Sequence, residues 1–296
     1  MKILLLGKDG QLGWELQRSL APLGELIALG PDAPGGNFTR LDEVERAVRS
    51  IAPDVIVNAG AHTAVDKAES EPELAHLLNT QAPAMLAAEA KRLGTWLVHY
   101  STDYVFDGSG STPWQETDAT NPLSVYGRTK AESEAAIQEA GCQYLIFRTS
   151  WVYAARGGNF AKTMLRLGQE KEALTVIDDQ VGAPTGADLL ADVTAHALRA
   201  TQHKPQVAGL YHLVAGGETS WHGYARFVLN LARQHGVPLK VAPEAIKAVP
   251  TSAFPTPAER PRNSRLNTHK LQSTFSLRLP PWQTGVARML AEILEK

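Results

Sequence analysis

The chain has 296 residues, of which 44% are hydrophobic and 20% are charged, and its formal net charge is −2. This length is sufficient for one large domain or two smaller ones. The nearly balanced charge, without a visible basic stripe, argues against a nucleic-acid-binding protein. Because Cys142 is the only cysteine, no intrachain disulfide can form, which fits a reducing compartment.

No segment has the pattern of a secretion signal or a membrane span. The apolar run at residues 3–6 is too short for the core of a signal peptide. Nothing approaches the ~18 consecutive apolar residues of a membrane-spanning helix. We therefore expect a soluble, cytoplasmic protein with no membrane partner.

Short apolar runs alternate with helical patterns along the first half of the chain. This alternation is typical of an α/β protein with a doubly wound parallel sheet and helices on both faces. In such sheets, ligands bind beyond the carboxyl ends of the strands. The predicted strands cover residues 1–6, 25–29, 55–61, 96–100 and 144–148, and the predicted helices 14–20, 41–51, 73–92 and 126–140.

A glycine-rich turn follows the first predicted strand. Gly7, Gly10 and Gly13 have the spacing G-x-x-G-x-x-G, and a helical pattern comes next. Glycines at this place allow a tight turn and let the backbone approach a pyrophosphate, whose charge the helix N-terminus stabilises. The pattern favours a Rossmann-type dinucleotide site, and a plain tight turn before a helix is the alternative.

The end of the second strand bears on the choice of nicotinamide cofactor. In dinucleotide-binding sheets, an acidic residue at this place binds the ribose 2′-hydroxyl and disfavours a 2′-phosphate. Here Gly30 is nearest to that place, and Asp32 follows it two positions later. The preference between NADH and NADPH is therefore open.

The central stretch, residues 96–130, carries a candidate catalytic set. A buried strand ends in Ser101 and Thr102, and Tyr126 and Lys130 share one face of the following helix. A phenol has a pKa near 10, and a cation within roughly 4–6 Å lowers it. Tyr126 could then exchange a proton with a reacting carbonyl or alcohol, next to a hydroxyl from Thr102 or Ser101. Tyr-x-x-x-Lys also occurs by chance, so the hypothesis depends on the strand ends that converge on it.

Other candidate sites have weaker patterns. His62, Asp66 and Glu69 follow a strand end, but no zinc-site spacing and no G-x-S-x-G motif is present. Trp151, also at a strand end, could stack on a flat ring or belong to the core. Three arginines could clamp phosphate oxygens or could form a solvated basic face: Arg260, Arg262 and Arg265.

From about residue 220 the pattern changes. Helical segments at 221–235 and 282–295 flank a proline-rich stretch. We expect this region to build a smaller, mostly C-terminal substrate-binding lobe. The predicted division is a NAD(P)-binding domain over residues 1–165 with about 187–215, and a substrate lobe over about 166–186 and 216–296.

Several motifs together resemble the extended short-chain dehydrogenase/reductase family. They are the glycine turn, the segment 101–106 (STDYVF) and Tyr126-x-x-x-Lys130, and the resemblance covers essentially the whole chain. Three further segments resemble its sugar-nucleotide reductases rather than its epimerases or dehydratases: 147–153, 179–185 and 260–266.

The resemblance implies a nicotinamide cofactor, NADPH or NADH, and a small-molecule sugar-nucleotide substrate. It implies a catalytic set of Thr102, Tyr126 and Lys130, with Asp103, Trp151 and Arg262 near the substrate. The residues implied for cofactor binding are Gly7, Gly10, Gln11, Leu12, Gly13, Gly30, Asn37, Phe38, Ala61, His62, Thr63, Tyr126 and Lys130.

Two positions depart from the family pattern. The acidic residue after the second strand is replaced by Gly30, and an Asp-Phe pair near the adenine is replaced by Asn37 and Phe38. Loss of an acid should make a 2′-phosphate easier to accept. Some members form homodimers bridged by Mg²⁺, and Glu15 matches one of the acidic positions involved.

The implied activity is reduction of the C4 keto group of dTDP-4-dehydro-L-rhamnose, for the dTDP-rhamnose used in cell-surface polysaccharide. Tyr126 would donate a proton, Thr102 would bind the same oxygen, and Lys130 would lower the pKa of Tyr126 and hold the ribose. One alternative is an epimerase or dehydratase of the same family, although a dehydratase would have an acidic pair where this chain has Asp103-Tyr104. Another is a non-catalytic regulatory subunit, which a broken catalytic set would favour.

Overall fold

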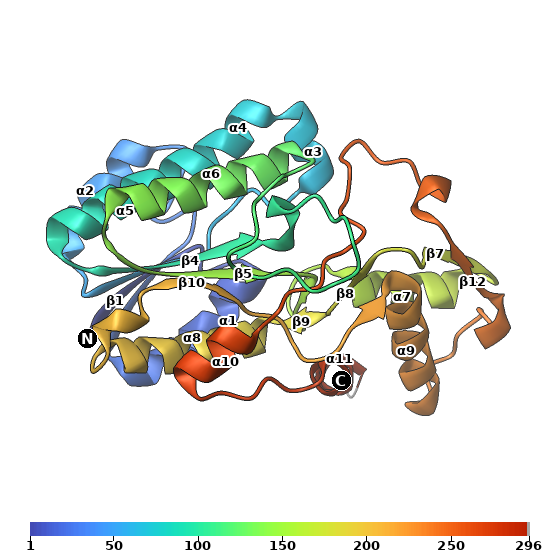
Figure 1. Cartoon of the computed structure of the whole chain (residues 1–296). Coiled ribbons are helices and arrows are strands. Elements are labelled where there is room, and N and C mark those ends of the chain that lie inside the picture. Colours follow the sequence, from blue (N-terminus) through green and yellow to red (C-terminus); the bar gives the residue numbers. More distant parts are fainter. Residues whose placement is uncertain (295–296) are drawn as a thin grey trace.

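The computed structural model describes residues 1–294. Its centre is a six-stranded parallel sheet with the order β10-β5-β4-β3-β1-β2 (Figure 1). The inner strands are nearly continuous apolar runs because both faces of the sheet are covered. The strands are β1 (Lys2–Leu6), β2 (Glu25–Leu29), β3 (Val55–Asn58), β4 (Trp96–Thr102), β5 (Gln143–Thr149) and β10 (Gly209–His212).

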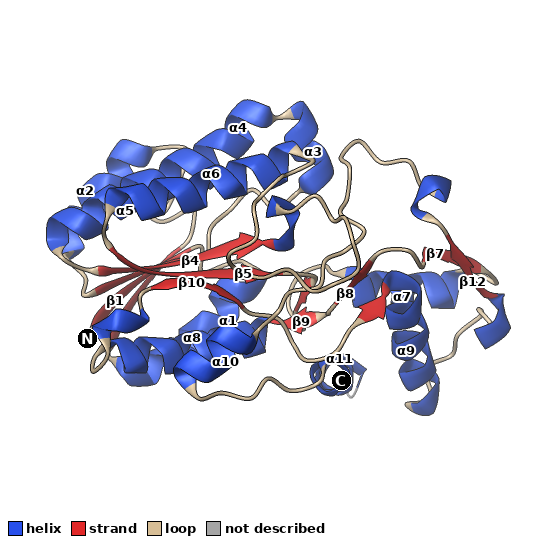
Figure 2. Ribbon diagram, viewed as in Figure 1, coloured by secondary structure: helices blue, strands red, loops and turns tan. Residues whose placement is uncertain are grey.

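Helices cover both faces of this sheet (Figure 2), so the predicted fold class is confirmed. Leu86 and Ile137 pack under one helical layer, and Leu16 and Leu190 pack under the other. The first layer contains α2 (Leu41–Ile51), α3 (Val65–Ser70), α4 (Pro72–His76), α5 (Ala82–Leu93) and α6 (Val125–Ala140), and the second contains α1 (Gln11–Leu20), α8 (Ala187–Thr201) and α10 (His269–Phe275).

The strand order indicates where a ligand would bind. β1 lies between β2 and β3, and α1 and α2, which follow β1 and β2, lie on opposite faces of the sheet. The connection from β1 to β2 therefore runs over one face of the sheet, and the connection from β2 to β3 runs over the other face. Ligand sites in open α/β sheets lie at such a switch point, beyond the carboxyl ends of the strands.

The long helix predicted over residues 73–92 is interrupted, which corrects the prediction. The chain forms α4 as far as His76, a π-helical turn over Leu77–Gln81, and then α5. This turn lies just before Pro83, which has no N–H to continue the hydrogen-bond ladder. Asn79, within the turn, is fully buried.

A second apolar cluster lies beyond the sheet. It is formed by α7 (Phe160–Glu170), α9 (Trp221–Gln234) and α11 (Trp282–Leu294), from which Met164, Val228 and Val286 pack together. Three small sheets accompany it. They pair β6 (Val152–Tyr153) with β9 (Thr185–Gly186), β7 (Leu174–Ile177) with β12 (Ile246–Val249), and β8 (Val181–Gly182) with β11 (Thr219–Ser220).

The division into two domains stays a prediction, and the packing gives its context. Ala161 and Leu165, which we assigned to the first domain, belong to the second cluster, whereas Leu271 of α10 packs into the core of the sheet. β8 and the start of β9 fall in the segment 178–185, which lies within the first part of the predicted substrate lobe. The last residues of the predicted lobe, 295–296, lie outside the described residues. Within 1–294, no helix has the length and apolar content that a membrane crossing requires.

Candidate active site

The glycine turn after β1 has the close backbone contacts that its glycines predict. Gly7 has a φ of +86°, and a Cβ on it would lie 2.6 Å from the backbone nitrogen of Gly60. A Cβ on Gly13 would lie 2.0 Å from the carbonyl oxygen of Gly7. Larger residues at Gly7 and Gly13 would push the turn away from β3 and α1. Both glycines are therefore required by packing at the switch point.

The start of α1 fits an anionic group. Gly10 is the N-cap residue, and because glycine has no side chain, no side-chain cap covers the first N–H groups of α1. Gln11 and Leu12 follow in the first turn, where backbone N–H groups have no partner within the helix. Such N–H groups and the helix dipole favour a phosphate. The turn therefore has the features that the pyrophosphate of a dinucleotide needs.

The positions predicted near the adenosine lie close to this turn. Phe38 is buried, and a Cβ on Gly60 would lie 2.8 Å from its ring carbon Cε2. Asn37 uses its side chain locally, because Oδ1 accepts hydrogen bonds from the backbone N–H and the hydroxyl of Thr39, at 2.9 and 2.8 Å. Gly30 is buried directly after β2. The roles of these residues in binding stay predictions.

Asn79 holds the segment that follows β3. It accepts a hydrogen bond from the backbone N–H of His62 at 2.8 Å and donates to the carbonyl of His62 at 3.1 Å. It also donates to Thr129 Oγ1 in α6 at 3.2 Å. Ala61 and Thr63, on either side of His62, are exposed. Nothing in the sequence singled out Asn79, because it lies inside the predicted long helix, where only the nearby Pro83 signalled a break.

Tyr126 meets Thr102 at the carboxyl end of β4. α6 begins after Ser124, whose Oγ accepts a hydrogen bond from the backbone N–H of Gly127 at 3.1 Å. This cap places Tyr126 in the first helical turn. Burial raises the pKa of Tyr126 to about 12, and the interaction with the Thr102 hydroxyl lowers this pKa in part. The phenol therefore keeps its proton at neutral pH.

Lys130 is directed into the protein. Its Nζ donates to the carbonyl oxygen of Tyr100 at 2.6 Å and lies 2.8 Å from His99 Nε2. Burial lowers the pKa of Lys130 to about 7, and burial with the nearby Lys130 charge lowers the pKa of His99. We expected Lys130 to lower the pKa of Tyr126, and this is wrong for the observed geometry, in which burial dominates and raises that pKa. Sequence reasoning missed His99, which lies inside an apolar strand.

Asp103 adds a buried carboxyl group next to Thr102. Thr102 Oγ1 donates to Asp103 Oδ1 at 3.0 Å, and Oδ2 is buried without a hydrogen-bond partner among residues 1–294. Burial raises the pKa of Asp103 to about 6. The Oγ of Ser101, the other hydroxyl that we considered, is also buried without a partner in the described part of the chain. Of the two hydroxyls, Thr102 is the one that meets Tyr126.

Trp151 stacks on another tryptophan. Its φ of +49° is uncommon for a residue with a side chain. The rings of Trp151 and Trp221 have centroids 3.6 Å apart and planes inclined by 15°, and Trp221 Nε1 donates to Gln180 Oε1 at 3.0 Å. The flat ring on which Trp151 stacks thus comes from the protein itself. Nothing local in the sequence connects Trp221 with Trp151, so we missed this pair.

The three arginines do not form a common solvated face. Arg260 donates to both carboxylate oxygens of Asp66, at 3.0 and 2.8 Å. Arg265 Nε lies 2.8 Å from Glu218 Oε2. Arg262 is exposed and lines a cavity of about 440 Å³ between the proline-rich stretch and the loop after β4. Arg260 lines the same cavity, but its guanidinium is paired with Asp66.

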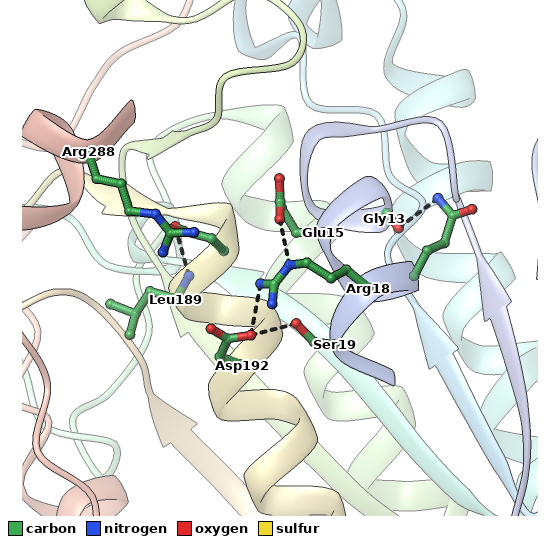
Figure 3. Close-up of polar contacts among 9 residues, drawn as sticks. Gly13, Glu15, Arg18, Ser19, Leu189, Asp192 and Arg288 are labelled. Carbon is green, nitrogen blue, oxygen red and sulfur yellow. Dashed lines mark hydrogen bonds and ion pairs between the residues drawn. The ribbon is translucent and has the colours of Figure 1, made fainter. Parts of the chain in front are cut away.

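Glu15, our candidate metal ligand, lies in an ion-pair cluster between α1 and α8 (Figure 3). Arg18 is 3.5 Å from Glu15 Oε2 and 2.9 Å from Asp192 Oδ1, and Ser19 Oγ donates to the same Asp192 oxygen at 2.6 Å. Residues 1–294 contain no group of three or more His, Cys, Asp or Glu side chains that could hold a metal ion. The predicted Mg²⁺ ligand at Glu15 therefore finds no support.

Comparison with known proteins places this chain among sugar-nucleotide reductases. A family model described as the RmlD substrate binding domain matches residues 1–295. The dTDP-4-dehydrorhamnose reductase of Salmonella typhimurium is 61% identical over 295 residues, which cover 99% of this chain and 98% of that protein. The reductase of the same name from Burkholderia thailandensis is 46% identical, with 100% of both chains covered.

Solved structures agree with these matches. A dTDP-4-dehydrorhamnose reductase from Clostridium acetobutylicum superposes with a TM-score of 0.89 at 36% identity, covering 100% of both chains. The enzyme from Bacillus anthracis, solved in complex with NADP, has a TM-score of 0.87 at 32% identity, covering 99% of this chain and 100% of that one. The chain therefore belongs to the dTDP-4-dehydrorhamnose reductase family, a branch of the extended short-chain dehydrogenases/reductases.

Proposed function

We propose that the chain reduces the C4 keto group of dTDP-4-dehydro-L-rhamnose to give dTDP-L-rhamnose, with NAD(P)H as the hydride donor. Family membership supports the reaction, because relatives that match over nearly their whole length carry this name. The observation that carries the proposal is the meeting of Tyr126 and Thr102 beyond the sheet, next to a glycine turn that fits a dinucleotide. The product would serve the synthesis of rhamnose-containing cell-surface polysaccharide.

Tyr126 is the proton donor in this proposal. When bound, the nicotinamide supplies a hydride to the carbonyl carbon, and negative charge develops on the carbonyl oxygen. Tyr126 gives its phenolic proton to that oxygen, and its pKa of about 12 keeps the donor form fully populated at neutral pH. The Thr102 hydroxyl, which donates to Asp103 Oδ1 in this structure, would turn its hydrogen to the same oxygen when the substrate binds. The phenolate then regains a proton from water.

The other predicted residues would bind the ribose and the substrate. For Lys130 we keep the role of binding the ribose hydroxyls, which the resemblance implies. Arg262, on the wall of the 440 Å³ cavity, would bind the diphosphate, because a guanidinium matches phosphate oxygens in a planar, two-point contact. Trp151, supported by Trp221, would flank the sugar. The homodimer and the cytoplasmic location stay predictions.

Absorbance at 340 nm tests the reaction and the role of Tyr126 together. Purified protein is mixed with dTDP-4-dehydro-L-rhamnose and NADH or NADPH. Tyr126→Phe should lower kcat by about 10²- to 10⁴-fold, the usual contribution of a general acid, without changing the Kd of the cofactor. Tyr144→Phe, at the opposite end of the sheet, is the matched control and should keep its activity.

The outcomes separate the proposed reaction from its alternatives. A flat trace with both cofactors, from folded protein, would refute the substrate. Full turnover by Tyr126→Phe would refute the role of the phenol but would leave the proposed substrate standing. An epimerase restores its cofactor in each cycle, so consumption of one NAD(P)H per product excludes it, and any turnover excludes a purely regulatory subunit.

A further inference from the structure

The carboxylate that this chain lacks at the end of β2 is supplied by the glycine turn. The backbone N–H groups of Gly7 and Lys8 donate to the carbonyl of Leu29 at 3.0 and 3.3 Å, so the turn lies directly against the end of β2. A Cβ on Gly30 would lie 1.9 Å from Asp9 Oδ2. The Asp9 carboxylate therefore fills the space in which a side chain at position 30 would begin.

We propose that Asp9 binds the ribose hydroxyls of the adenosine half of the cofactor and so sets the balance between NADH and NADPH. The inference rests on the dinucleotide site of the proposed function. An acidic group at the end of β2 accepts the hydrogen bond of a 2′-hydroxyl and repels a 2′-phosphate, and its effect depends on where the carboxylate lies rather than on which residue carries it. With Asp9 in this place, the glycine at position 30 does not remove the discrimination against a 2′-phosphate.

Lys8 modulates this discrimination. Its Nζ lies 3.1 Å from Asp9 Oδ1, and the side chains of Lys8 and Asp9 are 36% and 45% exposed, so both reach solvent where the cofactor would enter. A half-exposed ion pair of this kind is weak and can exchange its partner. Lys8 can therefore turn to a 2′-phosphate, and the pair should tolerate NADPH while Asp9 favours NADH.

Space at this site gives a direct way to test the carboxylate. Only side-chain atoms of Asp9 and Lys8 lie within 3.4 Å of a Cβ on Gly30, and Gly30 is not among the glycines with positive φ. Shortening Asp9 therefore makes room for an acid at position 30. In the double variant Asp9→Ser/Gly30→Asp, the carboxylate at the end of β2 is carried by position 30 in place of position 9.

The test measures equilibrium binding, by the change in fluorescence when NADH or NADPH is titrated into wild type, Asp9→Asn, Asp32→Asn and the double variant. Asp9→Asn should shift the ratio of the two Kd values at least tenfold towards NADPH, mainly through weaker NADH binding. The double variant should bring the ratio back towards wild type. Asp32→Asn removes the same charge from a nearby exposed residue and should leave the ratio unchanged. Circular dichroism verifies that each variant is folded.

Two results would contradict the inference in different ways. If wild type binds both cofactors and Asp9→Asn leaves the ratio unchanged, or if Asp32→Asn shifts it equally, then Asp9 is not the discriminating residue, while the proposed function stands. If folded wild type binds neither NADH nor NADPH, the dinucleotide site itself is wrong, and the proposed function fails with the inference.

Discussion

Replacing Lys130 with methionine should stabilise the folded protein at neutral pH, although it removes a member of the proposed catalytic set. Burial lowers the pKa of Lys130 from 10.5 to about 7. At about 1.4 kcal/mol per pH unit, this difference corresponds to about 5 kcal/mol of unfavourable free energy for the charged lysine. Methionine removes that penalty, but it also removes the hydrogen bond that the ammonium donates to the Tyr100 carbonyl, which costs about 1–3 kcal/mol, while His99 keeps its contacts with Asn58 and Ser133. The net gain at pH 7 should be roughly 2 kcal/mol.

The pH dependence separates the charge of Lys130 from its hydrogen bonds. Because the folded-state pKa is below the unfolded-state pKa, the unfolded chain binds more protons between pH 7 and 10.5, and wild-type stability rises with pH in this range. The advantage of Lys130→Met should therefore shrink by roughly 3 kcal/mol between pH 7 and 10. His99 contributes almost no slope above about pH 8, because its pKa is lowered from 6.5 in the folded state and its imidazole is neutral in both states there.

Urea denaturation followed by circular dichroism, at one-unit steps from pH 7 to 10, measures this difference directly. Wild type and Lys130→Met are compared with Lys247→Met, which removes an exposed lysine on β12 and should follow the wild-type curve. A Lys130→Met advantage that stays constant over the whole range would refute the reasoning, because only a lysine that loses its proton near neutrality in the folded state produces the slope.

Three further predictions follow from the site. Gly13→Ala should weaken NADH binding at least tenfold and lower the Tm, because its Cβ would meet the glycine turn at 2.0 Å, whereas Gly158→Ala, with open space around its Cβ, should bind normally. Trp221→Ala should raise the KM for the sugar nucleotide several-fold at unchanged cofactor Kd, because it removes the ring on which Trp151 stacks. An unchanged KM would contradict this expectation. Glu134→Gln should destabilise the protein by about 3–5 kcal/mol in urea, because it leaves the buried Arg148 without its carboxylate at 2.6 Å.

The sheet could be predicted from the sequence because its strands are short apolar runs separated by helical patterns. The apolar residues of β1, β3 and β4 are buried on both faces of the sheet, as continuous apolar runs in parallel strands usually are. The i, i+4 spacing likewise predicts that Tyr126 and Lys130 share a helix face, because helix geometry alone fixes it. Convergence of the strand ends follows from the topology of a parallel sheet.

The parts that could not be predicted depend on contacts between distant segments. The stacking of Trp151 on Trp221 joins the end of β5 to the start of α9, and no periodicity encodes such a pair. Asn79 lies in a π-helical turn that the sequence does not predict, and from there it binds His62 in the loop after β3. The direction of the Lys130 ammonium, towards His99 rather than Tyr126, is decided by partners inside the strand that the helix covers.

Gly30 shows why the charges around a cofactor have to be derived from the fold as well as from the sequence. Its position in the sequence indicates that an acid has been lost, and from that loss we inferred easier acceptance of a 2′-phosphate. In space, Asp9 fills the vacated volume with a carboxylate from the neighbouring turn. A ribose hydroxyl can donate a hydrogen bond to any acceptor that lies within reach, whichever residue carries that acceptor. The specificity of a dinucleotide site therefore has to be derived from all the charged atoms that surround the ribose, including those on the glycine turn.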